Sequence, residues 1–551
     1  MTNTIKNPIL RGFNPDPSII RVGDDYYIAT STFEWYPGVQ IHHSRDLIHW
    51  HLSSRPLNRA SQLNMLGVPD SCGIWAPCLT YSDGLFYLIY TDVKRYGRTT
   101  QSGVSGASLR DMHNYLVTSE TIDGRWSEPI FLNSSGFDPS LFHDDDGRKY
   151  LVNMLWDYRP GRNRFAGIQL QEFSTTEHKL IGPRDLIFQG TPLGLTEGPH
   201  LYKRNGYYYL LTAEGGTGWG HAVTFARSRS LKGPYELHPS KQILTSRDRP
   251  DVELQRAGHA DLVETQDGET YMVHLCGRPL PNRGRCILGR ETAIQKMYWT
   301  EDDWLVTAHG EPTPLVEVPA PKLVSHEFPR GPIRDDFDET TLSLNFQWLR
   351  SPFPHELFSL SEHPGHLRLY GLESIGSVFQ QSLVARRQQA FCYTAVASTD
   401  FNPEDFQQMA GLVCYYNGFK FHYLYVSYDE EIGRHLRVMS SSPDQVQPDS
   451  FTWPIALSKV APVELRVDVD FERLRFAFRQ SNEEWRWLPE VFDASILSDE
   501  ASAPGLPNFT GAFVGMCCQD ASGQRRPADF DYFEYIEREY EASHSVGVQC
   551  L

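Results

Sequence analysis

The stretch Asp16-Pro-Ser-Ile-Ile-Arg-Val-Gly23-Asp-Asp-Tyr-Tyr-Ile28 has a pattern that occurs five times in the chain. A polar or aromatic residue is followed by a short apolar run, a turn with glycine and, in most copies, a second run rich in Tyr or Phe. The other four copies begin at Trp75, Asp138, Glu197 and His259. Their first residues lie 59 to 63 positions apart, and a unit of this size repeated at a nearly fixed period indicates a modular fold.

Each copy predicts a β-hairpin. Pairs such as Asp83-Gly84 and Asn205-Gly206 separate the two runs. They are the strongest short-range hairpin signal, because glycine adopts a positive φ without a Cβ clash. About sixty residues suit a four-stranded blade with long loops, and blades repeated radially form a β-propeller around a channel. The sequence therefore predicts an all-β, five-bladed propeller over residues 1–311.

Equivalent residues of the blades should form a ring, because the first strand of every blade lies along the channel. We therefore expect Asp16, Trp75, Asp138, Glu197 and His259 to meet at one end. For a single copy, Asp-Pro or Glu-Gly-Pro could equally be a turn before a strand. Three carboxylates in one confined mouth are unfavourable without a compensating role, which favours a functional site.

The chain changes character after the fifth copy. Six prolines lie between residues 310 and 332, and we interpret residues 312–332 as a stiff linker. Beyond it, every odd position of Val463-Glu-Leu-Arg-Val-Asp-Val-Asp-Phe471 is apolar. This alternation is typical of a half-buried antiparallel strand, and it predicts a two-sheet β-sandwich over residues 333–551.

Composition excludes several classes of function. The 551 residues carry a formal net charge of −18 without a Lys/Arg cluster, so we expect no nucleic-acid partner. The chain contains no run of 18 apolar residues, so no membrane span is predicted. The first residues lack the apolar core of a secretory signal, and the nine cysteines lack paired spacing, so we expect reduced thiols and a cytoplasmic location.

Clustered carboxylates with aromatic neighbours favour carbohydrate chemistry. We expect Trp75, together with Phe33, Phe137, Trp156 and Trp219, to offer ring faces to sugars. Two carboxyl groups can cleave a glycosidic bond, and a third can raise the pKa of its neighbour. Calcium binding is the main competing use of such a cluster, but no Asp-rich loop supplies the remaining ligands. We therefore predict neither a catalytic metal nor another cofactor.

Several segments together resemble glycoside hydrolase family 43, and in particular its intracellular β-xylosidases with an appended concanavalin-like β-sandwich. They are Asn7-Pro-Ile-Leu-Arg-Gly-Phe-Asn-Pro-Asp-Pro-Ser18, Trp75-Ala-Pro77, Phe137-Asp-Pro-Ser140, Thr196-Glu-Gly-Pro199 and Gly289-Arg-Glu291. The resemblance covers essentially the whole chain, including Asp335-Asp-Phe-Asp338 and Phe509-Thr-Gly-Ala-Phe-Val-Gly515.

The resemblance implies an inverting hydrolase that removes β-D-xylose from the non-reducing end of short xylo-oligosaccharides. It implies that Asp16 is the general base, Glu197 the general acid and Asp138 the residue that modulates the pKa. A homo-oligomer, such as a tetramer, is a further hypothesis, because sandwich domains often make subunit contacts.

The resemblance also implies the residues that contact the sugar. Phe33, Trp75 and Arg290 would line the subsites, and a sandwich loop carrying Phe509 would close one wall of the pocket. His259 has two open interpretations. It is either a hydrogen-bonded channel residue or the holder of a water or a weakly bound divalent cation.

Three alternative functions make different demands on the sequence. A five-bladed sucrose or fructan hydrolase would carry an opening of the Trp-Met-Asn-Asp-Pro-Asn-Gly type, which the chain lacks. An α-L-arabinofuranosidase on the same fold stays open, because the two sugars present similar hydroxyl groups. A non-catalytic sugar-binding propeller would not need three differently tuned carboxylates.

Overall fold

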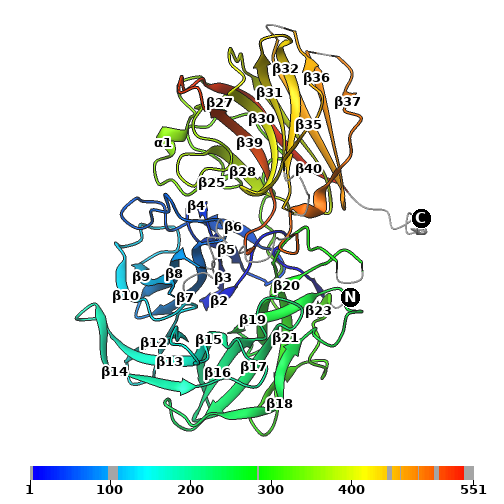
Figure 1. Cartoon of the computed structure of the whole chain (residues 1–551). Coiled ribbons are helices and arrows are strands. Elements are labelled where there is room, and N and C mark those ends of the chain that lie inside the picture. The colour runs from blue at the N-terminus through cyan, green and yellow to red at the C-terminus, as the bar shows by residue number, and fades with distance from the viewer. Residues whose placement is uncertain are drawn as a thin grey trace.

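The computed structural model describes residues 4–96, 109–281, 284–443, 449–458, 461–481, 483–501 and 508–538, and its two parts are both built of β-strands (Figure 1). The first part contains five four-stranded antiparallel sheets, each hydrogen-bonded in the order of the sequence. The first strand of each sheet contacts the first strand of the next, and that of the fifth sheet contacts that of the first. This closed ring confirms the predicted five-bladed propeller.

The blades are numbered 1 to 5 in chain order. Blade 1 contains β2 (Ser18–Val22), β3 (Asp25–Thr30), β5 (Gln40–Ser44) and β6 (His51–Ser54). Blade 2 contains β7 (Gly73–Ser82), β8 (Leu85–Arg95), β9 (Asp111–Ser119) and β10 (Ile130–Asn133). Blade 3 contains β11 (Ser140–His143), β12 (Lys149–Trp156), β13 (Phe165–Ser174) and β14 (Lys179–Phe188). Blade 4 contains β15 (Glu197–Arg204), β16 (Tyr207–Glu214), β17 (Ala222–Ser228) and β18 (Glu236–Thr245). Blade 5 contains β19 (Gln255–Glu264), β20 (Thr270–Gly277), β21 (Glu291–Trp299) and β22 (Leu305–Thr307).

The glycines of the repeat lie in the turns that join the first strand of each blade to the second. Their φ angles run from 63° to 84°, a region that residues with a Cβ rarely adopt. They are Gly23, Gly84, Gly147, Gly206 and Gly268. The hairpins predicted from the sequence are therefore present in all five blades.

The second part is a sandwich of two nine-stranded sheets. The first sheet contains β24 (Arg334–Asp335), β26 (Phe358–Ser359), β27 (Leu367–Leu369), β29 (Cys392–Asp400), β35 (Val463–Asp470), β36 (Arg473–Gln480), β37 (Arg486–Trp487), β38 (Phe492–Asp493) and β40 (Ala528–Glu537). The second contains β4 (Trp35–Tyr36), β25 (Gln347–Leu349), β28 (Ser382–Arg387), β30 (Gln408–Asn417), β31 (Lys420–Asp429), β32 (Gly433–Ser441), β33 (Asp449–Phe451), β34 (Ile455–Ala456) and β39 (Phe513–Asp520).

Strand β35 confirms the alternation seen in the sequence, because its four valine and leucine side chains are buried between partly exposed neighbours. The described helices are short, namely α1 (Pro354–Leu357) and the 3₁₀ turn η1 (Ala494–Ile496). None of the helices in the described part of the chain has the length and apolar character to cross a membrane.

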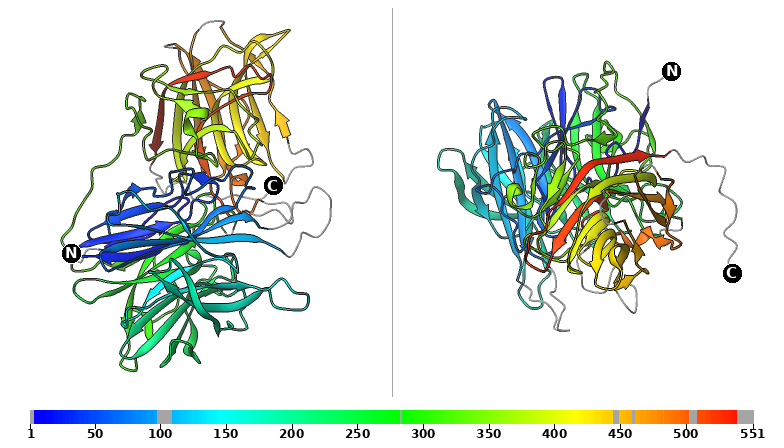
Figure 2. Two further views of the ribbon diagram at one scale, coloured as in Figure 1. Left: turned by 90° about the vertical axis from the view of Figure 1, so that its left-hand side faces the viewer. Right: turned by 90° about the horizontal axis from the view of Figure 1, so that it is seen from above.

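The proline-rich segment of residues 312–332 packs against the propeller. Its strand β23 (Glu317–Pro319) pairs with β1 (Thr4–Lys6) near the start of the chain. Further along, the ring of Phe328 lies 3.8 Å from that of His51 in blade 1. Figure 2 shows this segment passing along the outside of the propeller toward the sandwich.

A strand from the propeller half of the sequence completes a sandwich sheet. Strand β4 leaves blade 1 and pairs antiparallel with β25. Trp35 of β4 is fully buried, and its ring stacks on Phe513 with 3.6 Å between the ring centres. Arg350, just after β25, forms an ion pair with Asp70 at 2.5 Å. The two parts therefore share one continuous apolar core.

Candidate active site

One residue near the start of each blade has a left-handed backbone. The φ angles are 56° at Asp16, 37° at Ala76, 54° at Asp138, 55° at Gly198 and 44° at His259. These five positions are equivalent, so the register predicted from the sequence is wrong by one residue in blades 2 and 4. In both blades the strand pairing is irregular at this point, because the register shifts between Trp75 and Cys78 and between Glu197 and His200.

The side chain of Asp16 is held at both oxygens. Ser31 Oγ donates to Oδ2 at 2.7 Å, and Arg290 Nη1 lies 3.2 Å from Oδ1. The imidazole Nδ1 of His259 is 3.8 Å from the same Oδ1. Asp16 is 5% exposed, so these contacts hold a nearly buried carboxyl group in a single orientation.

Asp138 and Glu197 are close neighbours of Asp16. Gly198, the residue after Glu197, donates its N–H to Asp138 Oδ2 at 3.0 Å. Burial raises the pKa of Glu197 well above its usual value, and the charges of Asp138 and Asp16 raise it further. Burial and the charge of Asp16 also raise the pKa of Asp138, while Gly198 and Arg290 act in the opposite direction. The three carboxyl groups therefore act electrostatically on one another, as the sequence predicted.

His259 lies beneath the strand that carries Glu197. A Cβ added at Gly198 would lie 3.2 Å from its imidazole ring, which explains why glycine occupies that position. Burial lowers the pKa of His259 to about 4, against the opposing charge of Asp16. No group of three or more His, Cys, Asp or Glu placed to hold a metal ion occurs within the described residues. The cation suggested near His259 stays untested.

Aromatic rings surround Trp75 above the carboxylates. Ring centres lie 5.6 Å from it for Phe33 and Phe137, 5.5 Å for Phe509 and 4.7 Å for Tyr96. The orientation of Trp75 is fixed, because its indole Nε1 donates a hydrogen bond to Ser71 O at 3.1 Å. The predicted residues Phe33, Trp75 and Phe509 are thus brought together. With Phe137 and Tyr96 they form a cluster that we call the aromatic wall.

Phe509 reaches this group from the sandwich. Its carbonyl oxygen accepts a hydrogen bond from Arg290 Nη2, and its N–H donates to Ser71 Oγ at 3.0 Å. The guanidinium carbon of Arg290 lies 5.0 Å from the ring centre of Phe33 and 5.9 Å from that of Phe509. Arg290 therefore joins Asp16, the aromatic wall and the sandwich.

The other predicted aromatic residues lie further out. Trp156 packs on Phe165 at 5.5 Å and under the guanidinium of Arg110 at 4.1 Å. Trp219 lies instead against Arg256, 4.8 Å from its guanidinium carbon. Arg256 forms ion pairs with Asp499 and Glu500 of the sandwich half.

The sequence analysis did not identify Tyr96 and Arg110, which lie at the aromatic wall. Tyr96 follows β8, and the guanidinium of Arg110 lies 3.4 Å above its ring. Burial raises the pKa of Tyr96 to about 12, and the charges of Glu197 and Asp138 contribute, which places the phenol near both carboxylates. Neither residue belongs to the repeat, so no sequence signal marked them.

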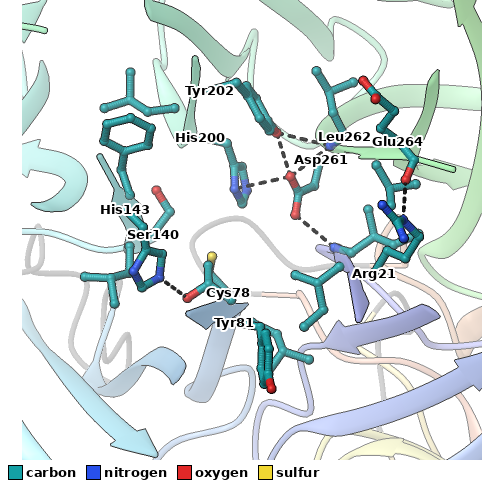
Figure 3. A pocket seen from close by; sticks show the side chains of 18 residues that line it. Arg21, Cys78, Tyr81, Ser140, His143, His200, Tyr202, Asp261, Leu262 and Glu264 are labelled. Carbon is teal, nitrogen blue, oxygen red and sulfur yellow. Dashed lines mark hydrogen bonds and ion pairs between the residues drawn. The ribbon is translucent and has the colours of Figure 1, made fainter. Parts of the chain in front are cut away.

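The channel also has a cavity of about 380 Å³ elsewhere along the five first strands (Figure 3). His200 and Tyr202 point toward Asp261 there. Asp261 accepts hydrogen bonds from Tyr202 Oη at 2.6 Å and Ser18 Oγ at 2.9 Å. None of the predicted site residues lines this cavity, and its one carboxylate on the channel axis is satisfied within the fold.

A five-bladed propeller with three buried carboxyl groups under an aromatic wall defines a carbohydrate-cleaving enzyme. The model of "Glycosyl hydrolases family 43" matches residues 5–305, and that of the "Beta xylosidase C-terminal Concanavalin A-like domain" matches residues 334–536. The chain belongs to glycoside hydrolase family 43.

Three similar proteins cover nearly the whole chain. A xylosidase/arabinosidase 43B of Humicola insolens is 53% identical, over 96% of this chain and 97% of its own. A β-xylosidase of Bacillus subtilis (strain 168) is 52% identical, over 97% of this chain and 100% of its own. The crystal structure of a xylan β-1,4-xylosidase from Bacillus halodurans C-125 superposes with a TM-score of 0.93 at 54% identity, covering 97% of this chain and 100% of that one.

The contact between Gly198 and His259 gives a first prediction. Gly198→Ala should lower kcat/KM on an aryl glycoside at least about tenfold, because the new methyl group displaces His259 and the strand of Glu197. Gly194→Ala is the matched control, since Gly194 also has a positive φ of 75° but nothing lies within 4 Å of a Cβ there. Equal activity of the two variants, both folded by circular dichroism, would contradict the packing argument.

Proposed function

We propose that the protein is an inverting, exo-acting β-xylosidase that removes β-D-xylose from the non-reducing end of short xylo-oligosaccharides. The observation that carries the proposal is the mutual influence of three buried carboxyl groups in one channel. The names of the similar proteins, two β-xylosidases and a xylosidase/arabinosidase, support the choice of sugar.

Glu197 is the proposed general acid. A general acid must keep its proton at the working pH, and the raised pKa of Glu197 supports this role. Asp138 contributes to that raised pKa by its charge, which supports its role as the modulating residue.

Asp16 is the proposed general base. Its carboxylate takes a proton from a water molecule while the water oxygen forms a bond to the anomeric carbon. The bond between that carbon and the glycosidic oxygen breaks, and Glu197 gives its proton to the departing oxygen. Ser31 and Arg290 hold Asp16 in place for this step. Attack from the face opposite the leaving group gives α-xylose.

The aromatic wall is the proposed sugar-binding surface. Phe33, Trp75 and Phe509 supply ring faces, and Arg290 supplies a guanidinium group for sugar hydroxyls. Trp156 would act one layer further out, through Arg110. Because Phe509 comes from the sandwich, the site is closed on that side, which favours release of terminal units over cleavage within a long chain.

A second activity, α-L-arabinofuranosidase, is supported by the name of the Humicola insolens relative. We also propose a cytoplasmic location, because the eight cysteines of the described residues are buried and form no disulfide. A homo-oligomer, such as a tetramer, completes the proposal, and a monomer mass in light scattering would refute it.

The substrate proposal is tested with aryl β-xyloside, α-arabinofuranoside and α-arabinopyranoside substrates, with the product anomer followed by NMR. Turnover should be fastest on the β-xyloside, with α-xylose as the first product. Faster turnover of the arabinofuranoside would reverse the order of the two activities. Release of β-xylose would overturn the inverting mechanism.

The division of roles predicts different behaviour of two variants. Glu197→Ala should lower kcat on xylobiose by about 10²–10⁴, but much less on an aryl xyloside with an activated leaving group, which departs without protonation. Asp16→Ala should lower kcat on both substrates alike, because the water must be activated in either case. Stopped assays measure kcat of both variants on both substrates. If the two variants lose activity in the same way on the two substrates, the roles assigned to Glu197 and Asp16 are refuted.

The pH dependence follows from the raised pKa of Glu197. Activity should fall as pH rises through that pKa, because the general acid loses its proton. Asp138→Asn removes the neighbouring negative charge, lowers the pKa of Glu197 and should move this basic limb of kcat/KM to lower pH. The Asn side-chain oxygen can still accept from Gly198, so the geometry is kept. A limb that stays in place or moves upward would refute the modulating role.

A further inference from the structure

A second cavity lies between the propeller and the sandwich, away from the carboxylates. This groove has a volume of about 970 Å³. Blade 1, residues 327–333 and the ends of β28 and β40 line it. Its lining includes Arg55 from the propeller and Arg387 from the sandwich, each only 6% exposed. Two buried guanidinium groups therefore meet at the boundary of the domains.

Arg55 has only neutral partners. Its Nε and Nη2 both donate to Gln40 Oε1, at 3.1 and 2.6 Å, and its Nη1 donates to Phe346 O at 3.0 Å. Burial alone lowers its pKa to about 9, and no nearby carboxylate opposes that effect. The positive charge of Arg55 is therefore uncompensated within the described residues.

Arg387 also has only neutral partners. Its Nε donates to Phe13 O at 2.7 Å, and its Nη1 donates to Gln347 Oε1 and to Gln40 Oε1, the latter at 2.9 Å. Its Nη2 is buried without a hydrogen-bond partner. Burial and the charge of Arg55 both lower the pKa of Arg387. One amide oxygen, that of Gln40, thus serves two cations.

The carboxylates that line the groove have other partners. Glu537 pairs with Arg11 at 2.8 Å, and Glu327, whose side chain is 80% exposed, lies 3.8 Å from His49. In the described part of the chain no carboxylate lies within 4.0 Å of either buried arginine. Arg386, beside Arg387, also lines the groove, and its Nε is buried without a partner.

Other buried arginines between the two domains are compensated. Arg350 pairs with Asp70, and Arg256 pairs with Asp499 and Glu500. A buried charge without a counter-charge is strongly unfavourable, because neither water nor an opposite charge stabilises it. Arg55 and Arg387 line a cavity, and a cavity can admit a counter-ion from solution.

We propose that this groove binds a small oxyanion, a phosphate or a carboxylate, between Arg55 and Arg387. Arg387 Nη2 has no partner within the described residues, and Nη1 and Nη2 of Arg55 each make one of the two hydrogen bonds that they can donate, so both side chains keep N–H groups for the oxygens of an anion. The bound anion would link blade 1 to the sandwich. It would also stabilise Arg387, whose Nε holds the backbone of Phe13, and Phe13 packs on Phe33 of the aromatic wall at 5.6 Å.

The test uses the full chain, with thermal unfolding in potassium phosphate compared with potassium chloride at equal ionic strength. Phosphate should raise the unfolding midpoint in a saturable way. Arg387→Lys keeps the charge but removes the Nη2 group that has no partner in the fold, so it should weaken phosphate binding at least about tenfold. Isothermal titration of the unaltered protein gives the same constant directly. Absence of saturable binding of both phosphate and a carboxylate would overturn the proposal, whatever the stability of the variant.

A matched control is Arg434→Lys. Arg434 is 7% exposed and donates to backbone carbonyls of the sandwich, but it does not line the groove. The Arg434→Lys substitution should leave the dissociation constant of phosphate unchanged. An equal loss in both variants would contradict the site, as would phosphate acting as a competitive inhibitor of glycoside hydrolysis with the same constant, since the anion would then bind at Arg290.

Two further ligands separate the sources of the oxyanion. Sodium glucuronate carries a carboxylate, and xylose is the neutral sugar control. A shift with glucuronate that depends on Arg387 would extend the site to carboxylates, and a shift with phosphate alone would restrict it to phosphate. An Arg387-dependent shift with xylose would show a sugar groove instead and would overturn the proposal.

Discussion

The contact of Arg290 with Asp16 is the interaction on which the site depends. Arg290 is 2% exposed, and a charge so deeply buried needs compensation. Asp16 supplies it at 3.2 Å, and Asp499 lies 3.9 Å from the guanidinium Nε. The same guanidinium holds the backbone of Phe509. One side chain therefore connects the electrostatic balance of the channel to the sandwich.

The backbone of the ring adds a second constraint. Asp16, Asp138 and His259 adopt left-handed conformations that cost about 1–2 kcal/mol each for residues with a Cβ. Such strain persists only where the surroundings fix the chain, and here the contacts between successive first strands do so. In blade 4 glycine takes the strained position, and Glu197 lies one residue earlier in the pairing with β16. The carboxylates therefore do not occupy equivalent places on the ring.

The fold was predictable because its determinants repeat. The turn glycines and the period of the first strands define five blades, and the alternation of β35 defines a sandwich strand. The three carboxyl groups were found for the same reason. The one-residue error in blades 2 and 4 arose because Trp75 and Glu197 stand just before the left-handed residues Ala76 and Gly198, and residue type alone does not reveal the backbone conformation.

Residues outside the repeat could not be found in this way. Tyr96, Arg110 and Asp499 each lie in a segment between strands, and their positions depend on contacts far apart in the sequence. Trp219 has the right residue type for a sugar surface, and it lies against Arg256, which pairs with Asp499 of the sandwich half. Composition identifies candidates of this kind without locating them.

Strand β4 has a consequence for how this architecture can be modified. Because β4 is encoded between two strands of blade 1 yet forms the edge of a sandwich sheet, the boundary between the domains in space differs from that in the sequence. A propeller separated from its sandwich would expose Trp35 and an unpaired strand edge, which favours aggregation. Sandwiches exchanged between relatives would have to match the residues around Trp35 as well as their own sequence. The residues at this boundary can therefore change only together.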